Sequence, residues 1–119
     1  MTNDHPEDCL FCRIYDGEIP ADTVAEGDGW MAFHDIDPQA PVHVLIIPRR
    51  HIESLAAFGP EDAELAGRLL LAAAETAREL GVAEDGYRVV MNRGERAGQS
   101  VFHAHLHLLA GRRMSWPPG

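Results

Sequence analysis

The chain of 119 residues has few basic side chains, few cysteines and no long apolar run. Arginine and lysine together number 10, against 19 acids, and the formal net charge is −9. This charge argues against broad binding to nucleic acid or to anionic membranes, although it permits one small anionic ligand in a local pocket. No apolar run approaches the roughly 20 residues of a membrane span. The acidic N-terminus lacks the basic and apolar regions of a secretory signal, so we expect a cytoplasmic protein.

The only cysteines are Cys9 and Cys12, which form a single C-x-x-C motif. Two cysteines are too few for a disulfide scaffold. In a cytoplasmic protein this spacing indicates either a metal site or a redox-active pair.

The length predicts one domain with a single core. We expect a flexible N-terminus over residues 1–8, a domain over 9–119, and a tail over 111–119 that Pro117 and Pro118 keep out of helix or strand. The hydrophobic pattern predicts an α+β fold, in which a five-stranded antiparallel sheet carries one long helix on one face and a short N-terminal helix. The expected elements are a short helix within 9–15, strands at 23–26, 30–34, 43–48, 87–92 and 101–109, and a long helix from Gly59 and Pro60 to a stop at Gly81.

The most informative stretch is His-Ala-His-Leu-His at residues 103–107. In a strand, side chains alternate between faces, so His103, His105 and His107 would share one face. The apolar residues between and beside them would pack beneath the helix: Phe102, Ala104, Leu106 and Leu108. Three aligned imidazoles can bind a metal, hold an anion, or act in nucleophilic and acid–base chemistry.

The loop before this stretch favours an anion. Residues 92–100 contain two glycines, amides at Asn92 and Gln99, and the hydroxyl of Ser100. Glycines let backbone N–H groups approach an anion closely. The loop and the histidines together indicate a phosphate site, while a zinc hydrolase that uses all three histidines as ligands remains open. His34, by contrast, is interpreted as an ordinary partly exposed residue.

Residues 98–107 resemble the signature of the histidine triad family, in which three histidines alternate with apolar residues. Further segments resemble its Hint branch: residues 33–36, 38–41, 47–51, His43 and the ending Trp-Pro-Pro-Gly at 116–119. The resemblance implies a homodimeric purine nucleoside phosphoramidase, with the sheet extended across the dimer. Related polyphosphate hydrolases and transferases differ around the triad or in the tail.

Carried over from the family, His105 matches the nucleophile, which forms a nucleotidyl-histidine intermediate. His107 matches a phosphate-binding residue, His43 a residue that orients His107 or relays a proton, and Ser100 the group beside the leaving atom. Trp116 matches a tail residue that crosses the dimer interface into the partner's leaving-group pocket.

The remaining family positions concern the nucleotide. Asn92, Gly98, Gln99 and Val101 match the phosphate-binding loop, and Asp35 matches the acceptor for the ribose hydroxyls. The purine slot is implied at Phe11, Ile14, Ile19, Phe33 and Ile36. Periodicity alone would make these five residues ordinary core.

In bacterial relatives with the C-x-x-C motif, the family pattern implies a zinc site, here formed by Cys9, Cys12, His51 and His103. Four protein ligands make such a site closed and structural, so catalysis would need no cofactor. Two free thiols or a redox pair are the alternatives. A nucleotide-binding interaction protein with little turnover is a further, non-enzymatic alternative, and the leaving amine and the preferred purine stay open.

Overall fold

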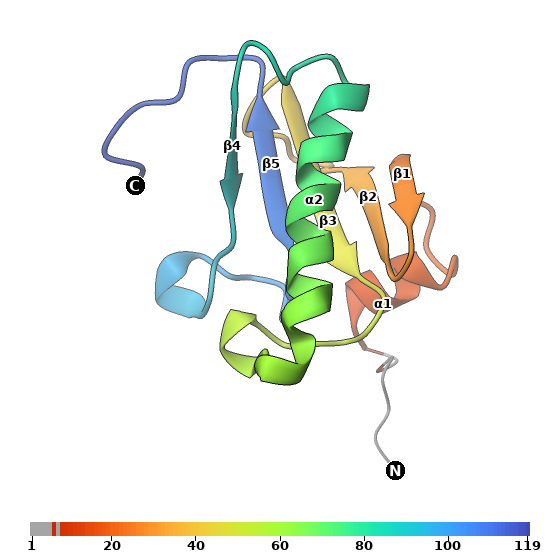
Figure 1. Cartoon of the computed structure of the whole chain (residues 1–119). Coiled ribbons are helices and arrows are strands. Elements are labelled where there is room, and N and C mark those ends of the chain that lie inside the picture. The colour runs from red at the N-terminus through yellow and green to blue at the C-terminus, as the bar shows by residue number, and fades with distance from the viewer. Residues whose placement is uncertain (1–5, 7) are drawn as a thin grey trace.

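The structure, a computed structural model, describes residue 6 and residues 8–119. The flexible segment predicted over 1–8 therefore lies, apart from two positions, outside the described residues. A five-stranded antiparallel sheet has the strand order β1-β2-β3-β5-β4, and α2 runs across one face of it (Figure 1). This confirms the predicted α+β fold. The elements are α1 (Leu10–Tyr15), β1 (Thr23–Gly27), β2 (Trp30–His34), β3 (Val42–Pro48), α2 (Ala63–Glu79), β4 (Tyr87–Val90) and β5 (Leu106–Ala110).

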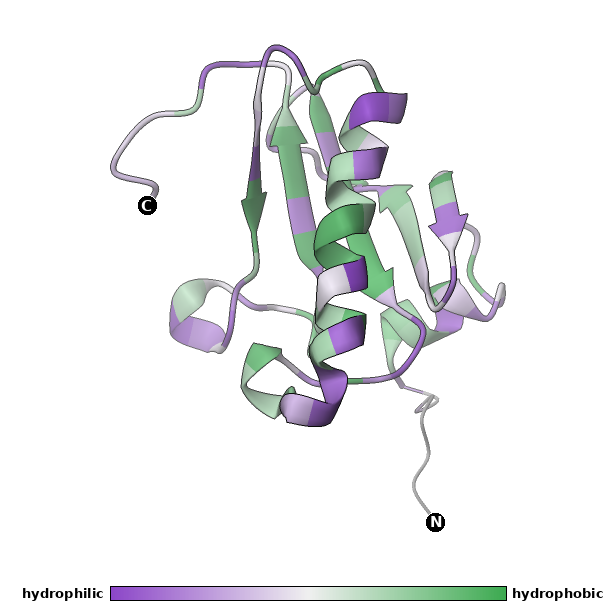
Figure 2. Ribbon diagram, viewed as in Figure 1, coloured by the Kyte–Doolittle hydropathy of each residue, from purple (hydrophilic) through white to green (hydrophobic). Residues whose placement is uncertain are grey.

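The central strand β3 divides the core into two parts. Its residues alternate between faces, so Val44 and Ile46 pack in the cluster that includes Leu69 of α2. Leu45 and Ile47 point to the other face, into a cluster with Phe11, Cys12 and Phe33. A strand covered on both faces is apolar at every position, which is why this run shows no alternation of polar residues. Figure 2 shows the same apolar character along β3 and β5.

Helix α2 ends where the sequence predicts, but it begins at Ala63, three residues after the predicted start at Pro60. A 3-10 turn over Pro60–Asp62 precedes it, and Gly81 follows with a φ of +73°, a backbone conformation that glycine adopts without strain. The Asp62 carboxylate accepts a hydrogen bond of 2.9 Å from the Gly59 N–H and pairs with Arg50 at 2.7 Å. These contacts tie the start of α2 to the end of β3.

The strand predicted through all three histidines is shorter than expected. β5 begins at Leu106, so His103 and His105 precede it. The chain leaves the ladder here because the Ala104 N–H donates to the Ile52 carbonyl, at 2.6 Å. Phe102 is consequently 47% exposed and does not pack beneath the helix, whereas Leu106 and Leu108 do.

Strand β4 is also shorter than predicted, since it ends at Val90 and leaves Asn92 in the following loop. Among the described residues, no helix is long and apolar enough to cross a membrane. The cytoplasmic location stays a prediction.

Candidate active site and metal centre

Two histidines come together on the sheet face opposite α2. His43 on β3 is opposite Leu109 of β5, and His107 is opposite Leu45 of β3. Because Val44, Leu106 and Leu108 face α2, their neighbours in sequence face the other way. The ring atoms His43 Nε2 and His107 Nδ1 lie 2.9 Å apart.

The hydrogen bonds around His43 determine where the ring protons lie. The Gln39 N–H donates to His43 Nδ1 at 3.0 Å, so a neutral His43 carries its proton on Nε2. That N–H donates to His107 Nδ1, which in turn leaves the proton of His107 on Nε2. The Asp35 carboxylate lies 3.5 Å from His43 Nε2, on the side of the same N–H group, and attracts its proton. His107 is therefore prepared to donate one hydrogen bond to a ligand.

His105 has the opposite arrangement. Its Nδ1 lies 2.7 Å from the His103 carbonyl, and since a carbonyl only accepts, Nδ1 carries the proton and Nε2 keeps its lone pair. The Phe11 ring packs edge-on against the His105 ring, with centroids 5.0 Å apart and an interplanar angle of 87°. The residue is 7% exposed, so its orientation is held by packing as well as by the hydrogen bond.

Burial favours the neutral form of these histidines. It lowers the pKa of His105, an effect that the His103 carbonyl and Asp35 oppose. Burial also lowers the pKa of His107 to about 4, and the neighbouring His105 and His43 act in the same direction. The pKa of His43 is lowered by burial, against the opposing effect of Asp35 and Asp37. A neutral imidazole at position 105 is the form that can attack an electrophile.

A cavity of about 340 Å³ lies in front of His105 and His107. It gathers ten of the sequence-predicted residues: Phe11, Ile14, Ile19, Phe33, Asp35, Ile36, Ser100, Val101, His105 and His107. We refer to it as the triad cavity. Ile36 is fully exposed at 101%, whereas Phe33 is 4% exposed, so apolar side chains stand both at its mouth and at its base.

Four further residues line the triad cavity without having been predicted: Leu10, Pro20, His34 and Leu45. Leu45 could have been found from alternation, because it lies two positions after His43 on β3 and pairs with His107. His34 carries no such signal, since a single histidine at the end of a strand is usually unremarkable.

Four other residues predicted for the site lie outside the lining of the triad cavity. His43, Asn92, Gly98 and Gln99 do not line it. The Asn92 amide nitrogen lies 3.9 Å from the position that a Cβ would take on Gly98, so Asn92 lies against this loop.

The Gln99 side chain is buried and is already engaged within the protein. It accepts from the Gly94 N–H at 2.8 Å and donates to the carbonyls of Glu53 and Val101 at 2.8 and 3.2 Å. It therefore shapes the loop over 94–101. Its backbone N–H donates to the Gly94 carbonyl at 3.1 Å, so Gln99 organises the loop with its side chain and its backbone alike.

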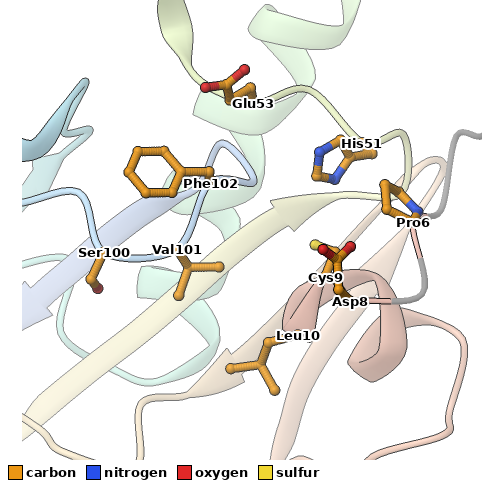
Figure 3. Close-up of a pocket in the computed structure, with 9 residues that line it drawn as sticks. All are labelled: Pro6, Asp8, Cys9, Leu10, His51, Glu53, Ser100, Val101 and Phe102. Carbon is orange, nitrogen blue, oxygen red and sulfur yellow. The ribbon is translucent and has the colours of Figure 1, made fainter.

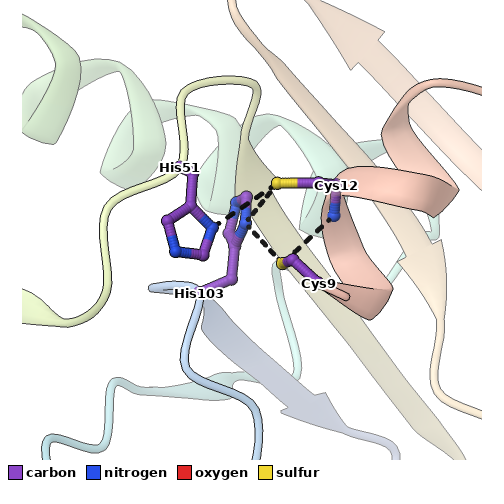
Figure 4. A group of neighbouring side chains, drawn as sticks. All are labelled: Cys9, Cys12, His51 and His103. Carbon is purple, nitrogen blue, oxygen red and sulfur yellow. Dashed lines mark hydrogen bonds between the residues drawn. The ribbon is translucent and has the colours of Figure 1, made fainter. Parts of the chain in front are cut away.

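A second cluster of side chains is formed by Cys9, Cys12, His51 and His103 (Figure 4). The Sγ atoms of both cysteines lie 3.4 Å from His103 Nδ1, and Cys12 Sγ lies 3.5 Å from His51 Nδ1. Around tetrahedral zinc, with Zn–S of about 2.3 Å and Zn–N of about 2.0–2.1 Å, sulfur and nitrogen ligands are separated by about 3.5 Å. These four residues therefore fit a metal ion.

The surroundings of His103 strengthen that fit. Its Nε2 donates to the Pro48 carbonyl at 2.8 Å, which leaves the Nδ1 lone pair directed at the two thiols. Ligating histidines commonly donate their other ring N–H in this way. Burial, with the neighbouring Cys9, raises the pKa of Cys12 to about 12, and a bound cation is what would favour the thiolate.

A second group that could hold an ion, Asp35 with His43 and His107, fits less well. Its two ring nitrogens lie 2.9 Å apart, which is a hydrogen-bond distance. Two nitrogen ligands of a tetrahedral zinc ion would be about 3.3 Å apart. Among the described residues, no metal-binding group combines the three histidines of the motif.

A separate cavity of about 450 Å³ borders the cysteine and histidine cluster (Figure 3). Cys9 and His51 line one part of it, and Ser100 and Val101 line another. Those last two residues also line the triad cavity. The short segment at 100–101 therefore lines both the cavity beside the candidate metal centre and the triad cavity.

The C-terminal tail is held against the outer strand. The Arg88 guanidinium on β4 donates to the Ser115 carbonyl at 2.9 Å and lies 5.9 Å from the centre of the Trp116 ring. Arg88 is opposite Leu109, which is itself opposite His43. Arg88 therefore lies on the same sheet face as the histidines, and Trp116 is 81% exposed beside it.

The comparisons with known proteins agree with this geometry. The HIT domain matches residues 16–114. An uncharacterized HIT-like protein of Synechocystis is 53% identical over 95% of this chain and 98% of its own length. The crystal structure of a HIT family hydrolase from Legionella pneumophila is 50% identical, covers 94% of this chain and 100% of that chain, and has a TM-score of 0.92. A histidine triad nucleotide-binding protein from Candida albicans is 34% identical over 92% of this chain and 83% of that chain, with a TM-score of 0.79. The chain therefore belongs to the HIT domain family.

Proposed function

We propose that this protein hydrolyses the P–N bond of purine nucleoside 5′-phosphoramidates and releases the nucleoside monophosphate, such as AMP. The Legionella relative is named a hydrolase and the Candida relative a nucleotide-binding protein, which supports this class of activity. The observation that carries the proposal is the state of His105. Its lone pair is on Nε2, its pKa is lowered by burial, and it lines a cavity with a second, donating histidine.

The reaction proceeds in two displacements. The His105 Nε2 lone pair attacks the α-phosphorus, the P–N bond to the amine breaks, and the amine leaves after gaining a proton from solvent. Water then attacks the phosphorus of the nucleotidyl-histidine and gives a proton back to solvent, the bond to His105 breaks, and the monophosphate is released. His107 donates its Nε2–H to a phosphoryl oxygen, and His43 holds the tautomer that allows this.

The other predicted residues then have specific places around the substrate. Ser100 is beside the leaving nitrogen. Asn92 and the backbone of Ser100 and Val101 lie around the phosphoryl oxygens, in a loop whose Gly98 and Gln99 N–H groups are bonded to the Glu95 and Gly94 carbonyls. Asp35 accepts from the ribose hydroxyls. The apolar part of the triad cavity, from Ile14 to Phe33 and Ile36, takes the purine.

The cluster of Cys9, Cys12, His51 and His103 would hold a structural zinc ion. When bound, zinc supplies a tetrahedral crosslink with no open position for substrate, so catalysis uses no cofactor. The four residues join the start of α1 to the segment that follows β3 and to the segment that precedes β5. His103 also accepts the hydrogen bond that orients His105, so the crosslink supports the nucleophile from behind.

A second copy of the chain completes the proposed enzyme. β4 is the last strand of the sheet, and beside it an apolar groove of about 310 Å³ runs between β4 and α2. Leu70 on α2 is 60% exposed at this groove. Pairing of β4 with its copy would extend the sheet across a homodimer and would bring Trp116 towards the partner's site.

The central test is His105→Ala. We expect the variant to lose turnover of adenosine 5′-phosphoramidate by at least about a thousandfold, because the covalent step has no other nucleophile. Mass spectrometry of the quenched wild-type reaction should show one nucleotidyl group per chain. Sedimentation of both proteins should give the mass of a dimer, and melting curves should agree within a few degrees.

Retained turnover in the variant would contradict the mechanism, and a monomeric wild type would contradict the dimer. Tight AMP binding without turnover of any phosphoramidate would favour the interaction protein. The structure gives no specific support to a catalytic zinc ion on the three histidines, since His103 lies with the cysteines.

A further inference from the structure

The triad cavity continues into a second cavity of about 510 Å³. The two share six residues: Ile14, Pro20, Phe33, His34, Asp35 and Ile36. The second cavity includes no histidine of the triad and no residue of the 98–101 loop. It adds Ala21 and Asp22 instead, so Asp22 lines the part of the slot that no triad histidine lines.

Asp22 is held there by the backbone. The His34 N–H donates to the Asp22 carbonyl at 3.0 Å, next to the point where Thr23 pairs with Phe33. Its carboxylate forms no hydrogen bond or ion pair with another described residue. It is an acceptor with both oxygens available, at a fixed place on the rim of an apolar slot.

The order of groups along the slot decides which part of a nucleotide meets Asp22. With the phosphate at His105 and His107 and the ribose at Asp35, the purine enters the slot by its glycosidic N9 side. The edge farthest from N9 is the Watson–Crick edge, which is the edge that proteins read by hydrogen bonding. That edge therefore points towards Asp22.

A carboxylate distinguishes the two purines at this edge. Guanine presents two adjacent donors, N1–H and the 2-amino group, and a carboxylate can accept both in parallel. Adenine presents one donor, the 6-amino group, beside an unprotonated N1, whose lone pair would face the negative charge. The carboxylate therefore meets two donors on guanine and one on adenine, so guanine is favoured.

We propose that Asp22 makes this a guanine-preferring site. The proposal rests on the proposed function and deepens it: guanosine phosphoramidates are the better substrates, and adenosine phosphoramidates are accepted less well. Asp22 is a specificity-determining residue that contacts the base and takes no part in the chemistry.

The test is a set of equilibrium dissociation constants for GMP, IMP and AMP, measured on the full chain by calorimetry at one pH and one salt concentration. We expect GMP to bind roughly five- to tenfold more tightly than AMP, since the carboxylate is exposed and partly screened. IMP should fall between them, because it keeps N1–H but lacks the 2-amino group.

Asp22→Ala should raise the dissociation constant of GMP about fivefold and leave that of AMP unchanged or slightly lowered. Glu18→Gln is the matched control, because it removes one negative charge at a nearby exposed position that lines neither cavity. It should leave the ratio of GMP to AMP affinity as in the wild type. Both positions are exposed, and melting curves verify that each variant is folded.

The outcomes separate the two proposals. Equal affinities of the wild type for GMP and AMP, or an undiminished GMP preference in Asp22→Ala, would overturn the role of Asp22 and leave the nucleotide site standing. If none of the three nucleotides binds, the proposed function itself fails.

Discussion

At the scale of residues, the three histidines of one motif have different chemistry because of different hydrogen-bond partners. His103 presents Nδ1 to two thiols, His105 donates Nδ1–H to a carbonyl, and His107 accepts at Nδ1 from His43. Identical side chains two residues apart thus differ in the partners of their ring nitrogens.

Because burial lowers the pKa of these histidines, the stability of the fold depends on pH. The pKa of His107 is lowered by burial to about 4 in the folded chain, whereas an unfolded histidine titrates near 6.5. Above pH 6.5 neither state binds the proton. Between about 6.5 and 4 the unfolded state binds it and the folded state does not, so stability falls as the pH falls through this window.

We therefore expect the free energy of unfolding, measured with urea, to decrease from pH 7 to pH 5 by more in the wild type than in His107→Asn. The asparagine removes the titrating group and keeps a polar side chain on the sheet. Carboxylates affect both proteins alike, so the difference between their slopes isolates the histidine. Equal slopes would show that His107 titrates normally.

At the scale of elements, the tail over 111–119 is anchored by one side chain of β4. The Arg88 guanidinium makes both the hydrogen bond to Ser115 and the contact with the Trp116 ring. Arg112 adds one hydrogen bond to the Gln39 carbonyl, at 3.1 Å. Exposed contacts of this type contribute about 0.5–1 kcal/mol each. This is enough to favour the docked position of the tail, and it is a small part of the free energy of unfolding.

We expect Arg88→Ala to expose the tail to trypsin, with cleavage after Arg112 and Arg113 about fivefold faster than in the wild type. Release of the C-terminal peptide is followed by mass spectrometry. Arg78→Ala, on the exposed last turn of α2, removes an equivalent cleavage site and serves as the control. The melting temperatures of both variants should stay within a few degrees of the wild type. An unchanged cleavage rate in Arg88→Ala would show that Arg88 does not hold the tail.

At the scale of the whole molecule, the Cys2His2 cluster connects segments that are far apart in the chain. Helix α1 has six residues, too few to be stable alone, and it forms one wall of the triad cavity through Phe11 and Ile14. A metal ion would join this helix to His51 and His103. It would close loops of about 40 and 90 residues.

Removal of the metal should therefore lower the melting temperature by at least about 10 °C, since 1 kcal/mol corresponds to about 4–8 °C in a domain of this size. The measurement combines metal analysis, with one zinc ion expected per chain, and melting curves before chelation, after chelation and after reloading. At a temperature where the chelated protein is still folded, turnover should persist. Absence of bound zinc together with a melting temperature insensitive to added zinc would contradict the structural site.

Much of the fold was predictable from local pattern. The apolar run of β3, the proline and glycine that bound α2, and the spacing of hairpin strands are properties of neighbouring residues, and neighbouring residues determine secondary structure. The extent of β5 was not predictable in this way. The start of β5 depends on Ile52, which lies in the loop after β3. The Ile52 carbonyl accepts the Ala104 N–H, so residues 103–105 do not pair with β3.

The sequence by itself determined the residue types of the candidate site and its family resemblance: a histidine motif, a glycine-containing loop and a cysteine pair. Only the tertiary structure decided their partners. The Gln99 side chain is committed to Glu53, and Asp22 and His34 line the slot, although none of these is marked by spacing. The reason is physical. The protonation and contacts of an imidazole ring or a carboxylate depend on the residues around it, and sheet pairing and packing bring those residues together from distant parts of the chain.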